Sequence, residues 1–231
     1  MFYCFSGTGN SQWVADKLQG LLQDEADVFG MVFPVYAWGV PKVVKEYLHT
    51  HMEDIKASKY VWAVITCGDD IGYADTILNN LLGRQVDAVF SVHMPNTYVC
   101  LPGFDTDPAD KAKAKVQATQ NRLPSIADSI NKREKRTDVC RGAMPWIKTY
   151  VLRPLFNRFL VTDRYFHTNS HCIHCQHCVR SCPLGNITIS PDNSIRWKHE
   201  NCTGCLRCYH QCPCHSIHFG IFTKNKGQHH L

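Results

Sequence analysis

The sequence predicts an α/β protein in two parts: a doubly wound parallel β-sheet with helices on both faces, followed by a small cysteine-rich α+β domain. Residues 1–100 alternate short apolar runs with amphipathic stretches, which is typical of repeated strand–helix–strand units. Nine of the 13 cysteines then fall between residues 172 and 214. With 44% hydrophobic and 19% charged residues in a chain of 231, a core can form and global disorder is excluded.

Four strands and three helices are expected in the first part. The strands are residues 1–5, 28–35, 60–66 and 86–93, of which 28–35 is a continuous apolar run suited to burial on both faces. Apolar residues at helical spacing predict helices over 10–22, 41–49 and 74–82. Because strands and helices alternate, the sheet is expected to be parallel.

The middle of the chain is polar, then basic and aromatic. Residues 105–136 are expected to be helical with an interruption at Pro124, and the apolar stretch 145–161 is expected to be a helix interrupted at Pro154. The composition changes at His171, where cysteine, histidine and turn residues take over. We therefore divide the chain into a first domain at 1–136, a basic helical bridge at 137–168 and a second domain at 169–231.

Eight cysteines follow the spacing C-x2-C-x2-C-x3-C-P twice, with the repeats thirty residues apart. They are Cys172, Cys175, Cys178 and Cys182, then Cys202, Cys205, Cys208 and Cys212. This is the bacterial two-cluster ferredoxin pattern, in which the fourth cysteine of each run ligates the other cluster. The pattern predicts one 4Fe–4S cluster on Cys172, Cys175, Cys178 and Cys212, and another on Cys202, Cys205, Cys208 and Cys182. Zinc sites usually use two separated C-x2-C pairs instead.

Three loops at the carboxyl ends of predicted strands form a candidate ligand site. Ser6-Gly7-Thr8-Gly9-Asn10-Ser11 joins the first strand to a helix and offers hydroxyl, amide and backbone donors for a phosphate. It lacks the lysine of a Walker loop and the third glycine of the dinucleotide fingerprint. The other loops contain Pro34, Val35, Tyr36, Ala37, Trp38 and Gly39, and Cys67, Gly68 and Asp69. Residues 96–98 are a further candidate wall.

Together these stretches resemble the flavodoxin–ferredoxin fusion proteins of anaerobes. The matching segments are FYCFSGTGNS, FPVYAWGVPK, TCGDD, MPNTY and the double cysteine motif. The resemblance implies a flavodoxin-like domain that binds FMN, a ferredoxin domain with two 4Fe–4S clusters, and electron transfer between them. It also implies one departure: only residues 23–27 separate the first helix from the second strand, so one edge strand of the flavodoxin sheet is expected to be missing.

Other functions remain open at this stage. The protein could be an FMN-dependent reductase of a small substrate fed by its clusters, or a two-cluster ferredoxin with a vestigial flavodoxin domain. The basic stretch 111–158 also raises nucleic-acid or membrane-surface binding, which would leave the cysteines unexplained. No serine–histidine–aspartate or paired-carboxylate site is evident. Without a signal-peptide pattern or a membrane-spanning apolar run, we expect a cytoplasmic protein with redox partner proteins and no nucleic-acid partner.

Overall fold

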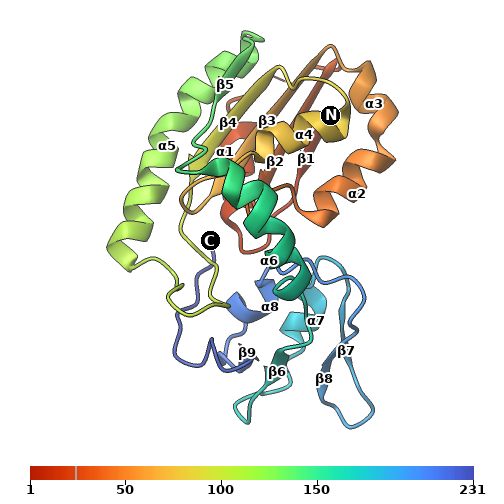
Figure 1. Ribbon diagram of the computed structural model, residues 1–231, viewed down its shortest axis with the longest axis vertical. Helices are drawn as coiled ribbons and strands as arrows, with labels where there is room; N and C mark the ends of the chain where they lie inside the picture. The colour runs from red at the N-terminus through yellow and green to blue at the C-terminus, as the bar shows by residue number, and fades with distance from the viewer. Residues whose placement is uncertain (24) are drawn as a thin grey trace.

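The computed structural model describes residues 1–23 and 25–231. A five-stranded sheet occupies one end of the molecule and the cysteine-rich region the other (Figure 1). All four strand pairings in this sheet are parallel, in the order β1-β2-β3-β4-β5. The strands are β1 (Phe2–Cys4), β2 (Val28–Pro34), β3 (Tyr60–Cys67), β4 (Ala88–His93) and β5 (Arg136–Asp138). The predicted parallel α/β sheet is confirmed.

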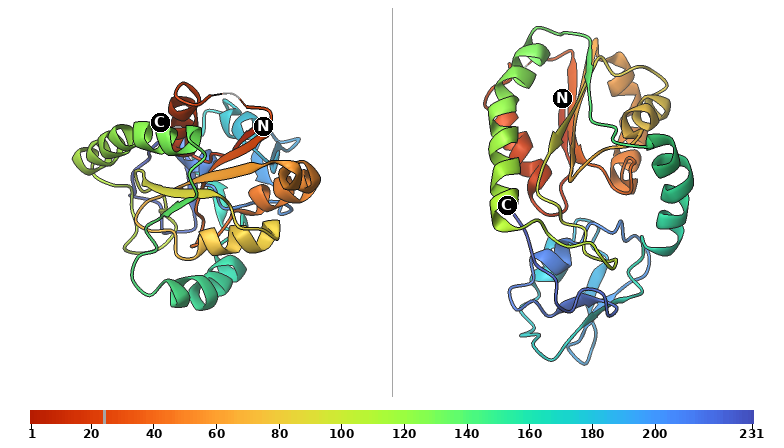
Figure 2. Two further views of the ribbon diagram at one scale, coloured as in Figure 1. Left: turned by 90° about the horizontal axis from the view of Figure 1, so that it is seen from above. Right: turned by 60° about the vertical axis from the view of Figure 1, so that its left-hand side comes forward.

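Helices cover both faces of the sheet, and β3 is therefore buried along its whole length. One face packs against α1 (Asn10–Gln19) and α5 (Ala109–Asn131) through residues such as Leu18 and Leu123. The other face packs against α2 (Lys42–Thr50), α3 (Met52–Ala57) and α4 (Ala74–Leu82). The right-hand view of Figure 2 shows α5 on one side of the strands and α2, α3 and α4 on the other. This sandwich fixes the carboxyl ends of the strands as one rigid edge.

The cysteine-rich region is built from two similar halves below that edge (Figure 1). Two antiparallel pairs, β6 with β9 and β7 with β8, frame two short helices. Their bounds are β6 (Phe166–Thr168), α7 (His177–Ser181), β7 (Ile187–Ile189), β8 (Ile195–Trp197), α8 (Arg207–His210) and β9 (Ile217–Phe219). A core of its own, including Trp197, Tyr209 and Ile217, holds the two halves together.

Strand β1 lies at the edge of the sheet and pairs with β2 alone among the described strands. Residues 20–23 and 25–27 contain no strand. All four crossovers step in the same direction across the sheet, yet α1 and α5 lie on one face and α2 to α4 on the other. When parallel strands step in one direction, a crossover over one face is right-handed and a crossover over the other face is left-handed. Two crossovers run over each face here, so two of the four depart from the usual right-handed rule.

Two expectations for the middle of the chain were wrong. Helix α5 runs through Pro124 without a break, because Pro124 is on its exposed face, where water can satisfy the carbonyl that loses its hydrogen bond. The segment after it forms β5, a fifth strand that the sequence did not predict, since Arg136, Thr137 and Asp138 carry no apolar pattern. Its pairing with β4 comes from the sheet edge that β4 offers.

The expected break at Pro154 is also absent. Residues Ile147–Leu152 form a π-helix, η1, that continues into α6 (Arg153–Phe159). Pro154 is the second residue of α6, where a missing N–H costs little because the wider π-turn has already changed the hydrogen-bond register. We call η1 and α6 together the roof helix. No helix in residues 1–23 or 25–231 is long and apolar enough to cross a membrane.

Candidate functional site: two cysteine cages beside a cavity at the sheet edge

The eight motif cysteines surround two separate small cavities. Cys172, Cys175, Cys178 and Cys212 line the first, which we call cage 1. Cys182, Cys202, Cys205 and Cys208 line the second, which we call cage 2. The fourth cysteine of each repeat has thus crossed to the other cage. Within the described residues, no three histidine, cysteine or acidic side chains are placed to hold a single metal ion.

The two cages repeat the same backbone conformation thirty residues apart. Three pairs of equivalent residues have positive φ angles: His174 (54°) with Gly204 (67°), Gln176 (60°) with Leu206 (59°), and Gly185 (57°) with His215 (48°). The N–H groups of Asn186 and Ser216 each lie 3.3 Å from a motif sulfur, Cys182 Sγ and Cys212 Sγ. Such turns direct backbone N–H groups inward, where they stabilise negative sulfur.

The chemistry of the cages fits iron–sulfur clusters. Burial raises the pKa of Cys178 and Cys205 to about 11 and that of Cys202 to about 12. These groups are therefore thiols at neutral pH until a positive metal stabilises the thiolate, so cluster binding releases protons. Four sulfurs around each cavity, backed by N–H donors, match the four cysteine ligands that a 4Fe–4S cluster requires.

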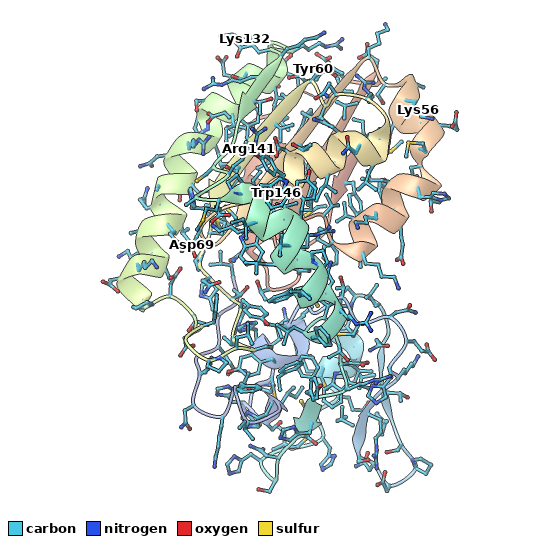
Figure 3. The ribbon with its side chains drawn as sticks, in the orientation of Figure 1. Lys56, Tyr60, Asp69, Lys132, Arg141 and Trp146 are labelled. Atoms are coloured by element: carbon cyan, nitrogen blue, oxygen red, sulfur yellow. The ribbon has the colours of Figure 1, made fainter. Side chains whose placement is uncertain are left out.

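A much larger cavity, of about 660 Å³, lies between the carboxyl edge of the sheet and cage 2. Pockets of this size hold organic cofactors. Figure 3 shows Asp69 at this edge, whereas Tyr60 and Lys132 lie at the opposite end of the sheet. Of the predicted loop residues, the cavity is lined by Ser6, Gly7, Thr8, Asn10, Ser11, Pro34, Val35, Tyr36, Ala37, Trp38, Cys67, Gly68 and Asp69.

The loop before α1 offers polar groups to the cavity. Ser6 Oγ accepts a hydrogen bond from Gly9 N at 3.1 Å, which leaves its hydroxyl proton available. Ser11 Oγ is bonded to Thr66 Oγ1 at 2.7 Å. Asn10 donates to the carbonyl of Pro95 at 2.9 Å, but its buried Oδ1 has no hydrogen-bond partner among the described residues. An unpaired buried polar atom beside a cavity indicates a missing ligand or water.

Two predicted glycines shape these loops without lining the cavity. Gly9 precedes α1 with a φ of 105°, a conformation that disfavours other residues. Gly39 forms a bridge with Tyr36 and packs against the Arg153 side chain, which a Cβ would meet at 2.1 Å. Their predicted contact with a cofactor stays a prediction, and the structure gives both glycines a place in the loop geometry.

The aromatic residues after β2 occupy different positions in the wall. Tyr36 packs edge-on against Phe5, and burial raises the pKa of its hydroxyl well above the ordinary value. Trp38 lies under the ammonium of Lys148 from the roof helix, 5.9 Å from its ring centroid. Ala37 and Trp38 have φ angles of 46° and 55°, which cost free energy in residues other than glycine. Such strain is typical of functional loops.

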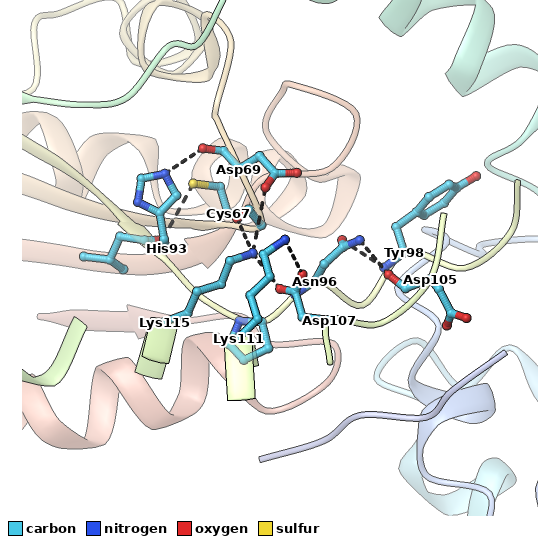
Figure 4. Close-up of polar contacts among 12 residues, drawn as sticks. Cys67, Asp69, His93, Asn96, Tyr98, Asp105, Asp107, Lys111 and Lys115 are labelled. Carbon is cyan, nitrogen blue, oxygen red and sulfur yellow. Dashed lines mark hydrogen bonds and ion pairs between the residues drawn. The ribbon is translucent and has the colours of Figure 1, made fainter. Parts of the chain in front are cut away.

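A polar network holds the loops after β3 and β4 in place (Figure 4). Lys115 donates to the carbonyl of Gly68 at 2.8 Å and to Asp107 at 2.6 Å, and Asp107 accepts from Asn96 N at 2.9 Å. Burial raises the pKa of Asp107, but bonds from Lys111, Lys115 and Asn96 outweigh it and hold the pKa at about 2. The two loops are thus tied to the start of α5 and presented rigidly to the cavity.

Sequence reasoning missed two walls of the cavity. The roof helix contributes Leu152, Leu155, Phe156 and Phe159, and the cysteine-rich region contributes Thr203, Gly204, Cys205 and Leu206. The sequence held a signal for the first wall: the stretch 145–161 has apolar residues on more than one helix face, which indicates contact with something besides the sheet. The second had none, because nothing local places residue 205 beside residue 7.

Contacts between the sheet and cage 2 are close. A Cβ at Gly7 would lie 2.9 Å from the carbonyl oxygen of Cys205, so only glycine permits this approach. Arg207 donates to the carbonyl of Ser6 at 3.4 Å. His210 bonds through Nε2 to the carbonyl of Thr97 at 2.7 Å. Cage 2 therefore forms part of the same structural unit as the cavity.

Comparison with known proteins defines the class of the cysteine-rich region. Residues 164–213 match the family described as a 4Fe-4S dicluster domain. The C-terminal region is therefore an iron–sulfur domain of the ferredoxin type, the kind that transfers single electrons.

One curated relative gives a more particular likeness. The chain is similar to the pyruvate synthase subunit PorD of Methanocaldococcus jannaschii, with 33% identity over 56 residues. The matched segment covers 24% of this chain and 65% of that protein, so the chain spans less than two thirds of its relative's length. No solved structure matches the chain at a significant level.

Proposed function

We propose that this chain is an iron–sulfur flavoprotein that passes electrons between an FMN in the cavity and two 4Fe–4S clusters in cages 1 and 2. One observation carries the proposal: a single cavity is lined both by the phosphate-type loop before α1 and by Cys205 of cage 2. A flavin bound there would be in contact with Cys205, which also lines cage 2. The sheet would then be a flavodoxin-like domain without one edge strand, within the division 1–136, 137–168 and 169–231.

The residues around the cavity fit the parts of FMN. Ser6, Thr8 and the N-terminus of α1 would hold the phosphate, and the free Oδ1 of Asn10 would accept a hydroxyl proton. Trp38 and the apolar residues of the roof helix would cover the ring and exclude water. When bound, FMN exchanges one or two electrons and each cluster exchanges one, which joins two-electron to one-electron chemistry.

Metal and flavin content test this proposal directly. Protein purified without oxygen should contain about eight iron atoms, about eight sulfides and one FMN per chain. Iron without flavin, even after FMN is added, would leave a two-cluster ferredoxin with a vestigial first domain. Zinc in place of iron would refute the proposal.

A hydroxyl-deleting variant locates the flavin site. Thr8 is buried at the cavity wall, so Thr8→Val should weaken FMN binding by about tenfold, the loss of one hydrogen bond to a charged group. Thr50→Val, at the exposed end of α2, is the matched control and should bind FMN normally. Flavin fluorescence quenching measures both affinities, and iron content should stay unchanged. Equal affinities in the two variants would place the flavin elsewhere.

The roof helix favours a second candidate, an FMN-dependent reductase of an apolar substrate. Leu155 and Phe159 are 53% and 58% exposed although they line the cavity, so a further apolar ligand could cover them. Such an enzyme would reoxidise its reduced flavin rapidly with one class of small molecule. A pure electron carrier would show no such selectivity.

The similarity to a pyruvate synthase subunit suggests the kind of partner. We propose that the iron–sulfur domain exchanges electrons with an oxidoreductase or with the carrier protein that serves one. Co-purification of the tagged, loaded protein with such an enzyme would support this, and would identify the direction of electron flow from the enzyme's substrate.

A further inference from the structure

The two cysteine loops of the repeat have the same backbone but opposite exposure. We call residues 172–178 loop 1 and residues 202–208 loop 2. At one pair of equivalent positions, Ile173 is 64% exposed and Thr203 only 4%. Gln176 is exposed, whereas its counterpart Leu206 is buried. Loop 1 is therefore an open surface and loop 2 an interior one.

Loop 2 is covered by the sheet and the roof helix. Gly7 approaches the backbone of Cys205, and Val161, just beyond the roof helix, lies next to Gly204. Among the described residues, loop 1 makes no hydrogen bond to the sheet or the roof helix. Its bonds stay within the cysteine-rich region, as between His174 and the carbonyl of Asn193 in the turn between β7 and β8. Cys175 is an exposed cysteine within loop 1. Cage 1 thus lies close to solvent and cage 2 close to the cavity.

The chain segment that contains loop 1 is free of carboxylates. Residues 164–191 contain no aspartate or glutamate. Arg180 is exposed and donates to the carbonyl of Cys175 at 3.0 Å, so its positive charge lies beside cage 1. The next carboxylate along the chain, Asp192, accepts hydrogen bonds from Ser190 and Ser194 and lies 3.8 Å from Arg196.

We propose that loop 1, together with the adjacent Arg180, is the docking surface for an acidic one-electron carrier protein, with Ile173 at its centre and Arg180 as its main charge. The proposal rests on cage 1 holding a cluster, which is part of the proposed function. The exposure of loop 1 brings a partner close to cage 1, and the charge of Arg180 selects an acidic surface. In the complex, one electron would pass between the cluster held by cage 1 and the carrier, and no proton or group would be transferred.

Binding of two haem proteins of opposite charge tests the proposal. The soluble domain of cytochrome b5 is the acidic probe and cytochrome c the basic one. Both are titrated in oxidised form against the oxidised, cluster-loaded protein at low ionic strength, so that affinity is measured without electron transfer. The loaded protein is required because the negative charge of the cluster also acts on this surface. We expect cytochrome b5 to bind more tightly, and its affinity to fall as salt is added.

Two pairs of variants locate the surface. Arg180→Glu should weaken cytochrome b5 binding by about tenfold, whereas Lys224→Glu, which changes the net charge equally at an exposed site outside loop 1, should change it less than about twofold. Ile173→Glu should weaken binding, whereas Ile221→Glu, at a site 84% exposed, should not. Stopped-flow reduction of cytochrome b5 by the reduced protein should slow in the same two variants.

Each outcome bears on one statement. Equal effects of Arg180→Glu and Lys224→Glu, or tighter binding of cytochrome c, would overturn the docking surface. Iron and sulfide are measured on every preparation. If Arg180→Glu has lost a cluster, the comparison of Ile173→Glu with Ile221→Glu takes its place. A wild-type preparation without iron would instead refute the proposed function, and one with iron but no flavin would leave this test fully valid.

Discussion

Loop 1 and loop 2 are two copies of one motif in two different environments. They share cysteine spacing and positive φ angles, and the fourth cysteine of each repeat lines the other cage. Loop 2 packs against Gly7 and the cavity, and loop 1 faces solvent. The motif determines what each loop binds, because ligand spacing acts locally. The neighbours determine which loop is covered inside the molecule and which is exposed to solvent.

Removal of one ligand from each loop should give the largest difference. Cys205→Ser should lose about four of eight iron atoms and weaken FMN binding by about tenfold or more, because Cys205 also forms the cavity wall. Cys175→Ser should lose as much iron and leave FMN binding unchanged, since cage 1 is separate from the cavity. Iron analysis and flavin titration measure both. Equal loss of flavin affinity would contradict the comparison.

Truncation of side chains at equivalent positions should lower the free energy of unfolding much more in loop 2 than in loop 1. Leu206 is buried in the core of the cysteine-rich region, so Leu206→Ala should cost about 2–5 kcal/mol. Gln176→Ala, with nearly the same φ angle, should cost less than about 0.5 kcal/mol. The rate of iron release to a chelator should rise in the first variant alone. Similar rates in both would show that loop 2 is not held by its packing.

A methyl group at Gly7 should push loop 2 away from the sheet. The added Cβ would lie 2.9 Å from the Cys205 carbonyl oxygen and 2.4 Å from the Tyr36 hydroxyl. Such overpacking costs about 1–3 kcal/mol, and we expect Gly7→Ala to weaken FMN binding as well. Gly20→Ala is the control, because its nearest neighbour would be 3.9 Å away. Thermal unfolding and flavin titration measure the two effects. If Gly7→Ala changed neither stability nor FMN affinity, the interface between the sheet and loop 2 would be able to open.

Asp107 should support the cavity without affecting loop 1. Because its pKa of about 2 lies below the ordinary 3.8, the ionised form stabilises the fold above pH 3.8, and this contribution disappears as the pH falls toward 2. Asp107→Asn should therefore lower the free energy of unfolding by about 2 kcal/mol, equally at pH 5 and pH 8. Asp54→Asn, on the surface of α3, should change it little.

Urea unfolding at the two pH values gives the measurement. A difference that grows between pH 5 and pH 8 would show that another titrating group is responsible. Cytochrome b5 binding should be the same in Asp107→Asn as in the wild type, because the network of Asp107 (Figure 4) holds Gly68 and Asn96, which line the cavity and not loop 1.

Prediction from sequence succeeded where continuous apolar runs or helical spacing gave a signal. The apolar runs ending near Pro34, Cys67 and His93 are strands, and the predicted helix at 74–82 begins and ends where the structure has α4. It failed at Pro124 and Pro154, where exposure and a π-turn make proline tolerable. It also missed β5, whose three residues pair with the open edge that β4 offers.

The sequence by itself determined the chemistry of the ligands: eight cysteines at fixed spacing, and hydroxyl and amide groups between a strand and a helix. These are local patterns, and a few residues are enough to specify them. The tertiary structure decided that cage 2 borders the cavity and that loop 1 is exposed. Those facts depend on contacts such as Gly7 with Cys205, which join residues almost two hundred positions apart and leave no periodic trace in the chain.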